Sequence, residues 1–455
     1  MSWYLPRYRV DIKQLARLAG GTGGRGHRVA SNSDEDAVTL AVAAVRAAAG
    51  GERRAPDRLY FSTTRPTYLD KGQATIVAAA AGWGPDVRTY DFHGTVRSGI
   101  GALVAGLEAP GRTTVALADQ RYGPPGSTED LAGADAGVAI TVSDDAIATI
   151  EAVAAQSSPL HDRWRPEGAL ATRAWDVRWS ADQLDPLVDE VVASTLNDAG
   201  LTLDEVDHVA LVSPNPRVGA RLRKRMAPVA APGSRIEGAG VAQPGLELAH
   251  LLSIAEPGHT ILLVVAADGA EALLLRASDA LPQRRPASPY DATATLPMDA
   301  AAYYRLRGTL VQDSGRRPAP PAPAAPAALR NRDWKFALHA ASCDECGAAA
   351  LPPRRVCFKC QATDRMTPIA LADRAAVVSA FTLDHLASPD ATPAVAAVLD
   401  FGEGISGRFA LTDVDPDTVR IGDRIAMSFR VVSDPPGGPR NYFWKGRPVV
   451  EEDER

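Results

Sequence analysis

The sequence is poor in cysteine: four occur in 455 residues, and all four lie between positions 343 and 360. The rest of the chain therefore has no thiol for a disulfide or for nucleophilic catalysis. Long apolar runs are also missing. The longest, at 261–265, has the length of a buried strand and falls far short of the roughly 20 residues of a membrane span. We expect no membrane partner.

An excess of positive charge is absent as well, because the net charge is −6. Nucleic acid binding needs a basic surface, so we expect no nucleic-acid partner. The start of the chain is too polar for a signal peptide, which predicts a cytoplasmic protein. A 45% apolar and 23% charged composition is ordinary for a globular chain, and this length allows two or three domains.

The cysteines form two CxxC pairs separated by ten residues, Cys343 with Cys346 and Cys357 with Cys360. This spacing brings four thiolates to one point, and Gly347 gives the first pair a flexible turn. Cytoplasmic thiols favour metal binding over disulfides, and zinc accepts four thiolates. Iron in a rubredoxin-like site and a disulfide or redox pair are the alternatives. A closed four-thiolate zinc site, one ion per chain, is structural.

The residues after 375 alternate short apolar runs with turn signals, which predicts a small antiparallel barrel. The Pro/Ala-rich tract at 316–328 predicts an extended linker. We divide this part into a linker at 311–330, a zinc ribbon at 331–372 and a barrel at 373–455.

The ribbon, the barrel strands with DPDTVRIGDRI and the terminal NYFWKGRPV resemble zinc-ribbon/OB-fold proteins associated with acyl-CoA enzymes. The resemblance implies that this OB-fold module accompanies a thiolase-fold partner and helps to form its acyl-CoA site.

The first three hundred residues contain an internal repeat. LEAPGRTTVALAD at 107–119 is echoed 147 residues later by IAEPGHTILLVVAAD at 254–268, and each is preceded by a helical and a strand pattern. Strands that are apolar throughout indicate sheets covered on both faces by helices. Two such halves, 1–165 and 166–310, predict a layered α/β/α/β/α fold. Ser33 is the expected N-cap of the first long helix.

The segments YLPRYRVD, SDEDAVTLAVAA, KGQATIVAAAAG and RSGIGAL resemble the hydroxymethylglutaryl-CoA synthase-like branch of the thiolase superfamily, over about 1–310. The resemblance implies a thiolase fold, a CoA or acyl-carrier thioester as substrate, and at least a homodimer.

That family forms an acyl-thioester on a cysteine at the start of a buried helix, where the helix N-terminus stabilises the thiolate. Aligning RSGIGAL on the family pattern places Val96 at the cysteine position. The family's glutamate aligns with Thr64, and its histidine aligns near Ser213. Valine cannot carry an acyl group, so the resemblance implies a protein that works without an acyl-cysteine.

Other groups near these positions are candidates for chemistry. Asp91 and His93 lie just upstream of the vacant cysteine position, on a strand-to-helix turn expected to face the acyl site, and are candidates for proton transfer. The competing interpretation is that they satisfy a turn or a dimer interface. The hydroxyls of Thr95 and Ser98 are candidates for substrate binding, and the amides at 97–99 for an oxyanion hole.

Two further segments carry weaker signals. Ser213 and Asn215 are located to bind a thioester carbonyl, although a post-strand SPNP is also a common turn. The glycine-rich GGTGGRGH at 20–27 allows a phosphate cradle, but it lacks the Walker lysine pattern, and a surface loop is the competing interpretation.

Two functions follow as expectations. The first is an enzyme of the acyltransferase, synthase or aldolase type that makes or cleaves C–C bonds, or transfers acyl groups, without a cysteine intermediate. The second is a non-catalytic pseudo-synthase subunit that scaffolds a cysteine-bearing thiolase or ketosynthase in a heteromer.

Overall fold

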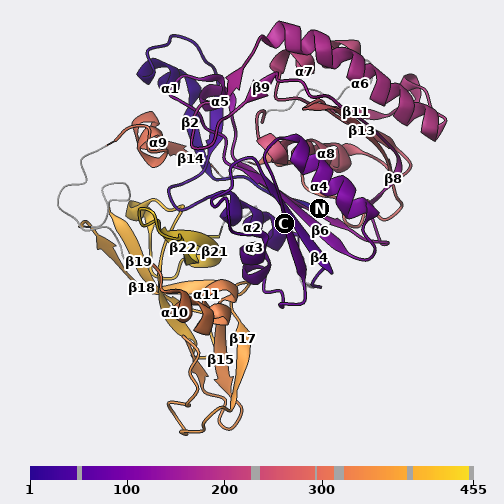
Figure 1. Cartoon of the computed structure of the whole chain (residues 1–455). Helices are drawn as coiled ribbons and strands as arrows, with labels where there is room; N and C mark the ends of the chain where they lie inside the picture. The colour runs from indigo at the N-terminus through magenta and orange to yellow at the C-terminus, as the bar shows by residue number, and fades with distance from the viewer. Residues whose placement is uncertain (49–53, 227–235, 293–294, 312–321, 387–392, 450–455) are drawn as a thin grey trace.

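Two mixed β-sheets form the body of the protein (Figure 1). The computed structural model describes residues 1–48, 54–226, 236–292, 295–311, 322–386 and 393–449. In spatial order, the first sheet consists of β1 (Ser2–Tyr4), β7 (Ala136–Val142), β6 (Thr113–Asp119), β4 (Arg58–Thr63) and β5 (Arg88–His93). The second consists of β11 (His208–Val212), β12 (Thr260–Val265), β13 (Gly269–Ala277) and β8 (Ala148–Ser157).

Helices cover both faces of both sheets, which gives the body five layers (Figure 1). The outer pair on the first sheet is α2 (Ala37–Ala47) and α3 (Ala74–Ala80). The central pair is α4 (Arg97–Glu108) and α8 (Gln243–Ile254), and the outer pair on the second sheet is α6 (Val177–Ala199) and α7 (Pro216–Arg225). The predicted α/β/α/β/α fold is confirmed.

The all-apolar strands follow from this layering. In β6, Leu117 packs with the central helices and Ala116 packs with α2 and α3. In β12, Leu263 packs with the central helices and Leu262 packs with α6. Because successive side chains of a strand point to opposite faces, a strand covered on both faces is apolar over its central residues. The polar residues of β6, Thr113, Thr114 and Asp119, lie at its two ends.

The internal repeat is also visible in the strand directions. Strand β4 is parallel to β6, which is antiparallel to β7; likewise β11 is parallel to β12, which is antiparallel to β13. Strand β8 precedes residue 165 in the chain, yet it pairs with β13 and completes the second sheet. The two halves therefore share this sheet.

A small sheet and short elements flank the body. The sheet has the order β14 (Leu296–Met298), β2 (Tyr8–Asp11), β3 (His27–Ala30), and it packs with α1 (Ile12–Leu18) and α9 (Ala300–Leu306). Nearby lie α5 (Thr128–Ala132) and the hairpin of β9 (Arg163–Trp164) and β10 (Arg173–Ala174). The 3₁₀ helices are Leu203–Glu205, Gly240–Ala242, Pro289–Asp291 and Pro416–Thr418.

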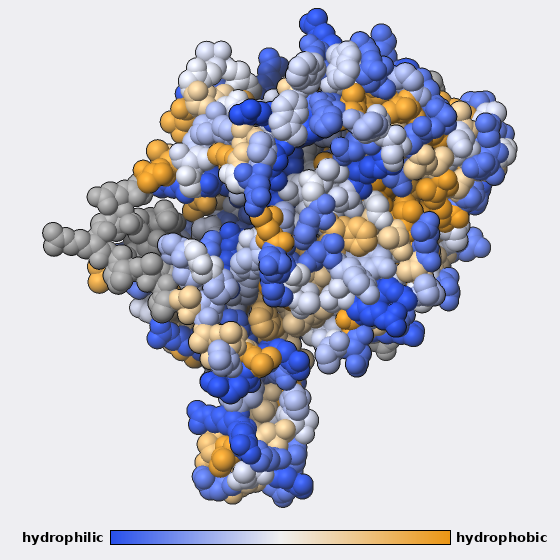
Figure 2. Space-filling model, in the orientation of Figure 1, coloured by the Kyte–Doolittle hydropathy of each residue, from blue (hydrophilic) through white to orange (hydrophobic). Residues whose placement is uncertain are grey.

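The C-terminal part begins with helices α10 (Ala325–Arg330) and α11 (Arg332–Ala337) and continues as a three-stranded ribbon and a barrel. The ribbon strands are β16 (Ala349–Ala350), β15 (His339–Cys343) and β17 (Met366–Ala370). The ribbon projects from the body as a narrow stalk (Figures 1 and 2). In the view of Figure 2, apolar residues are scattered over the body among polar ones.

The barrel is a five-stranded antiparallel sheet, as predicted. Its order is β20 (Ser406–Ala410), β19 (Ala394–Asp400), β18 (Ala376–Asp384), β21 (Arg424–Ser433) and β22 (Asn441–Pro448). A bridge between Leu411 and Gly446 joins the two ends of the sheet. Among the described helices, none is long and apolar enough to cross a membrane.

Two local predictions need correction. The N-cap of α2 is Asp36, whose carboxylate accepts the N–H of Thr39 at 2.9 Å while the Thr39 hydroxyl accepts the N–H of Asp36 at 2.8 Å. Ser33 lies before the chain turns into the helix. In the predicted linker, 312–321 lies outside the described residues, and 325–330 is helical, because the proline occupies the first turn and alanines follow it.

Candidate functional site

Helix α4 begins directly after strand β5, and Val96 lies at its start with 7% of its surface exposed. The N–H of Arg97 donates to the Thr95 hydroxyl at 3.1 Å. The N–H groups of Ser98 and Gly99 donate to the carbonyls of Thr95 and Val96, each at 3.1 Å. The amides predicted to form an oxyanion hole thus already have acceptors within the turn.

Asp91 and His93 point to the other face of the first sheet. The Asp91 carboxylate caps α3 by accepting the N–H of Gln73 at 2.6 Å and that of the next residue at 2.8 Å. The His93 ring lies edge-on to Phe61, which packs with α2 and α3, whereas Phe92 between the pair packs with the central helices. The structure does not direct this pair toward the start of α4.

His93 and Asp91 nevertheless form a polar pair. The Nε2 atom of His93 is 3.8 Å from Oδ2 of Asp91 and 3.4 Å from Nε2 of Gln73. Its Nδ1 atom is buried without a hydrogen-bond partner among the described residues. The predicted proton-transfer role stays a prediction, and the capping of α3 gives Asp91 a structural role.

The remaining candidates are placed by local hydrogen bonds. The Ser98 hydroxyl donates to the carbonyl of His93 at 3.0 Å, so it closes the turn in which Thr95 is exposed. The Ser213 hydroxyl donates to a carbonyl at the end of β12 at 2.8 Å. Asn215 is the N-cap of α7 and also donates to the main chain at the start of α6 at 3.1 Å. Each side chain thus has a structural bond, and their substrate-binding roles stay predictions.

A cluster of four arginines, which the sequence had not indicated, joins the segments that follow β4 and β11. Its members are Arg65, Arg121, Arg163 and Arg165, together with Glu129 of α5. Arg121 donates to the Thr64 hydroxyl at 2.8 Å, and Arg165 donates to the Thr64 carbonyl at 2.6 Å. Arg163 donates to the carbonyl of Pro214 at 3.1 Å.

The cluster therefore connects Thr64 with Pro214, which follows Ser213 in the chain. Thr64 aligns with the family's glutamate, and Ser213 lies near the position of its histidine. Arg97 at the start of α4 links the same region to the second sheet. Its guanidinium donates to the main chain of Gln156 at 2.9 Å and of Asp268 at 2.7 Å. The acidic side chain of Asp268 is in turn close enough to affect the pKa of Arg163.

In this cluster, hereafter the arginine cluster, three of the four arginines share ion pairs with a single carboxylate. Arg121, Arg163 and Arg65 all pair with Glu129, the last at 3.9 Å, and Arg165 has no ion pair among the described residues. Burial, followed by the neighbouring arginines, lowers the pKa of Arg163 and Arg165. Burial opposes ionisation of Glu129, but the arginines still hold its pKa below the usual value.

The glycine-rich segment lies at the surface. Residues 20–26 are largely exposed beside α1, and 22–26 line a cleft of about 440 Å³ with Asp11 and Lys13. A second cleft of about 580 Å³ also contains Asp11 and continues toward His27 and Tyr290. The surface-loop interpretation is consistent with this exposure, and no described contact indicates a phosphate.

The four cysteine sulfurs converge at the tip of the ribbon, where all lie within 4.8 Å of one another. The Sγ atoms of Cys343 and Cys360 are 3.5 Å apart, and those of Cys346 and Cys357 are 3.6 Å apart. Sulfurs bound tetrahedrally at about 2.3 Å from an ion lie about 3.8 Å apart, so the cluster fits a metal. Gly347 adopts φ of 70° in the first turn, as its predicted role requires.

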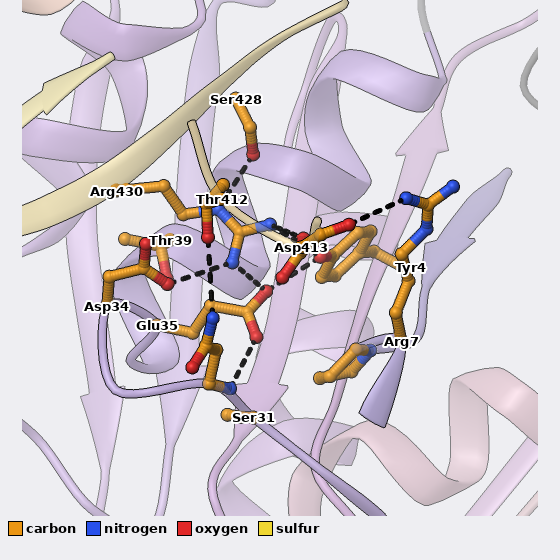
Figure 3. Close-up of polar contacts among 12 residues, drawn as sticks. Tyr4, Arg7, Ser31, Asp34, Glu35, Thr39, Thr412, Asp413, Ser428 and Arg430 are labelled. Atoms are coloured by element: carbon orange, nitrogen blue, oxygen red, sulfur yellow. Dashed lines mark hydrogen bonds and ion pairs between the residues drawn. The ribbon is translucent and has the colours of Figure 1, made fainter. Parts of the chain in front are cut away.

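The barrel is attached to the body through a buried ionic cluster, hereafter the junction cluster (Figure 3). Arg430 of β21 is 2.6 Å from Glu35, 2.6 Å from Asp413 and 3.4 Å from Asp34, and its side chain is 1% exposed. Lys445 also pairs with Asp34 at 2.8 Å. The three carboxylates surround the guanidinium, so this buried charge is fully compensated.

The comparisons with known proteins agree with this architecture. Residues 369–430 match the family model described as ChsH2, C-terminal OB-fold domain. A hydroxymethylglutaryl-CoA synthase of Methanocella arvoryzae is 33% identical over 36% of this chain, and the match spans 52%, about half, of that relative. A second, of Pyrobaculum calidifontis, is 29% identical over 59% of this chain and 84% of its own length.

Solved structures show the same fold. An HMG-CoA synthase complexed with CoA has a TM-score of 0.58 at 16% identity, covering 67% of this chain and 88% of its own. The curacin-pathway HMG synthase in complex with holo donor-ACP has a TM-score of 0.52 at 15% identity, covering 62% and 81%. Over its body the chain is thus similar in sequence to hydroxymethylglutaryl-CoA synthases and shares the fold of these solved structures, and residues 369–430 match an OB-fold domain family.

Proposed function

We propose that this protein binds acyl thioesters of CoA or of an acyl carrier protein, and supports C–C bond formation or cleavage, or acyl transfer, without an acyl-cysteine. The carrying observation is the position of the sulfurs. All four cysteines converge in the ribbon, while buried Val96 occupies the start of α4. The CoA and carrier-protein complexes of two structural neighbours support thioesters as ligands.

Purified protein incubated alone with acyl-CoAs and candidate acceptors tests this proposal. Release of free CoA and formation of a C–C product are measured, with intact-mass spectrometry to detect any covalent acyl group. Turnover without an adduct is expected. If His93 supplies the base, His93→Ala abolishes turnover while CoA binding remains. An acyl adduct on any residue of the body would contradict the proposal.

A second function is favoured by a specific observation. Asp91, Ser213, Asn215 and the amides at 97–99 are all engaged in structural hydrogen bonds. This arrangement suits a non-catalytic subunit that positions a thioester for a cysteine-bearing thiolase or ketosynthase. Co-expression with such a partner, followed by the same CoA-release assay, distinguishes the two. Activity that requires the partner's cysteine favours the scaffolding function.

For the ribbon we propose one structural zinc ion held by Cys343, Cys346, Cys357 and Cys360. The all-thiolate donor set and its spacing support zinc, and a closed site leaves no position for substrate. Elemental analysis of the purified chain is expected to give about one zinc per chain. Cys346→Ser is expected to lose the metal, and metal-free wild-type protein would contradict this assignment.

We also propose that two copies associate through β5. This strand is the end of the first sheet, where Arg88 and Tyr90 are exposed, and no described strand pairs with its outer edge. Unpaired edges favour strand pairing with another chain. Light scattering should give a dimer mass for the wild type and a monomer mass for Tyr90→Lys.

A further inference from the structure

A buried glutamate of the second sheet faces the central layer of the body. Glu271 lies near the start of β13 and is 6% exposed. Leu273 and Leu275 of the same strand pack with the central helices, whereas Leu274 packs with α6. Because side chains alternate along a strand, Glu271 shares the face of Leu273 and points between the two sheets. A carboxylate among these apolar side chains is costly, so it needs a partner or a function.

The partner is Arg97, the residue that follows Val96 at the start of α4. Its Nε atom is 3.8 Å from Oε2 of Glu271, and no described residue donates a hydrogen bond to this carboxylate. Two main-chain carbonyls hold the Arg97 guanidinium in place, and a Cβ at Gly269 would lie only 2.5 Å from it. The Glu271 carboxylate therefore lies beside the start of α4, and the described residues leave its acceptor positions unused.

The surroundings of Glu271 adjust its basicity. Burial raises the pKa of Glu271 above its usual 4.5, and the positive charge of Arg97 opposes this rise. Its partners on the two neighbouring strands, Val265 and Ala155, are apolar. The nearby acidic residue Asp268, in the turn before β13, acts on Arg163 of the arginine cluster. A carboxylate with a raised pKa is a stronger base than one in water, while Arg97 still favours its ionised form.

From this geometry we infer that Glu271 is the catalytic base that removes a proton from the α-carbon of the bound acyl thioester. The inference rests on the proposed function, because it takes the start of α4 as the place of the acyl group. It assigns the base to the second sheet. His93 and Asp91, the candidates from the sequence, lie on the face of the first sheet that packs with α3.

The step transfers one proton and forms one C–C bond. The proton moves from the α-carbon to the Glu271 carboxylate, and the electron pair of the C–H bond becomes an enolate. The enolate carbon attacks the carbonyl carbon of an aldehyde or ketone acceptor, and the resulting alkoxide takes the proton back from Glu271. The positive charge of Arg97 stabilises the enolate oxygen. The carboxylate is regenerated and the thioester bond stays intact, so no acyl-cysteine is required.

Exchange of the α-protons of acetyl-CoA and butyryl-CoA with D₂O tests this step without an acceptor. Mass spectrometry measures deuterium uptake with the full chain, and isothermal titration calorimetry measures thioester affinity. Glu271→Gln has the same shape and should lower the exchange rate at saturating thioester by about 100-fold or more, with a Kd within about threefold of the wild type. Glu271→Asp should keep part of the rate.

Two further readouts separate a base from a structural residue. Added formate should partly restore exchange in Glu271→Ala, because it supplies the missing carboxylate. The wild-type rate should rise with pH as Glu271 ionises, and Glu271→Gln should lack this rise. The matched control is Glu151→Gln on β8 of the same sheet, which breaks a more exposed pair with Arg276 and should keep the wild-type rate.

The remaining outcomes each have a defined meaning. A wild-type rate in Glu271→Gln, or a loss of exchange in His93→Ala in its place, would overturn the inference. Loss of thioester binding together with exchange in Glu271→Gln would make Glu271 a structural residue and also overturn it. Wild-type protein that binds the thioesters without exchange would overturn the inference and leave the proposed thioester binding intact. Failure of both thioesters to bind would overturn the proposed function and the inference with it.

Discussion

Two clusters of buried or half-buried charged side chains in this molecule have different charge balances. In the junction cluster, three carboxylates surround Arg430 (Figure 3). Lys445 pairs with one of them, Asp34. In the arginine cluster, four guanidinium groups converge on Glu129. The first group is complete without a ligand and holds two domains together. In the second, Glu129 is the one carboxylate among the described residues that lies within ion-pair distance of these guanidinium groups.

The two clusters also differ in what they connect. The junction cluster joins the start of α2 to barrel strands β21 and β22, and Arg440 pairs with the N-cap residue Asp36 at 2.8 Å in the same interface. Acidic residues at a helix N-terminus are stabilised by the helix dipole as well as by these cations. The arginine cluster joins loops at the ends of strands, which is where open α/β folds place their ligands.

The largest effect is expected from breaking the junction cluster. Arg430→Met leaves Asp34, Glu35 and Asp413 without their buried cation, and should lower the free energy of unfolding by about 3–5 kcal/mol. Chemical denaturation followed by tryptophan fluorescence measures this change. Arg408→Met, at an exposed position of β20, serves as the control and should change it by less than about 0.5 kcal/mol. Equal effects of both substitutions would contradict the conclusion that the junction cluster holds the barrel to the body.

The pH dependence of the free energy of unfolding tests the acidic residues of the same cluster. Burial raises the pKa of Glu35 from 4.5 to about 7. The positive charge of Arg430 opposes this rise, and the nearby carboxylates of Asp413 and Asp34 add to it. The native state therefore keeps a proton that the unfolded chain loses, and stability should fall as pH rises between these values. The slope is at most about 1.4 kcal/mol per pH unit.

Glu35→Gln removes this titration and keeps a group of similar shape. Its stability relative to the wild type should therefore increase as pH rises from 4.5 to about 7, the pKa range of Glu35. Thermal unfolding of both proteins across this range measures the difference. A constant difference at all these pH values would show that Glu35 titrates normally.

The fold was largely predictable from the sequence, because its signals are local or periodic. The apolar strands at 113–119 and 260–265 repeat with their turns, which gave the layered body. The CxxC spacing gave the sulfur cluster. The alternation of Tyr90, Asp91, Phe92 and His93 also contained a usable signal: odd and even positions of a strand face opposite sides, so Asp91 and His93 share the face of α3.

The two charged clusters could not be predicted in the same way. Arg430 and Asp34 are 396 residues apart in the chain, and the members of the arginine cluster come from separate loops. No spacing within one segment links them, and each arginine taken alone resembles an ordinary surface residue. Their meaning depends on packing that brings several loops together, which a single sequence does not reveal.

Removing the shared carboxylate of the arginine cluster should have an intermediate effect. Glu129→Gln is expected to lower the free energy of unfolding by about 2 kcal/mol, because the carboxylate is partly exposed and its three ion pairs are lost together. Inorganic phosphate should stabilise this variant more than the wild type in thermal unfolding, since the cluster becomes more positive. Glu151→Gln, which breaks the more exposed pair with Arg276, is the control and should show no added response to phosphate.

The smallest effect on the free energy of unfolding should come from removing Arg165, one arginine of the arginine cluster. Arg165→Gln loses a hydrogen bond to the Thr64 carbonyl but also relieves repulsion from Arg65 and Arg121. These effects oppose each other, so in ligand-free protein we expect a change in unfolding free energy below about 1 kcal/mol. Denaturant unfolding without added anions measures it. A loss as large as that of Arg430→Met would mean that the arginine cluster is a balanced structural clamp, and the contrast between the two regions would disappear.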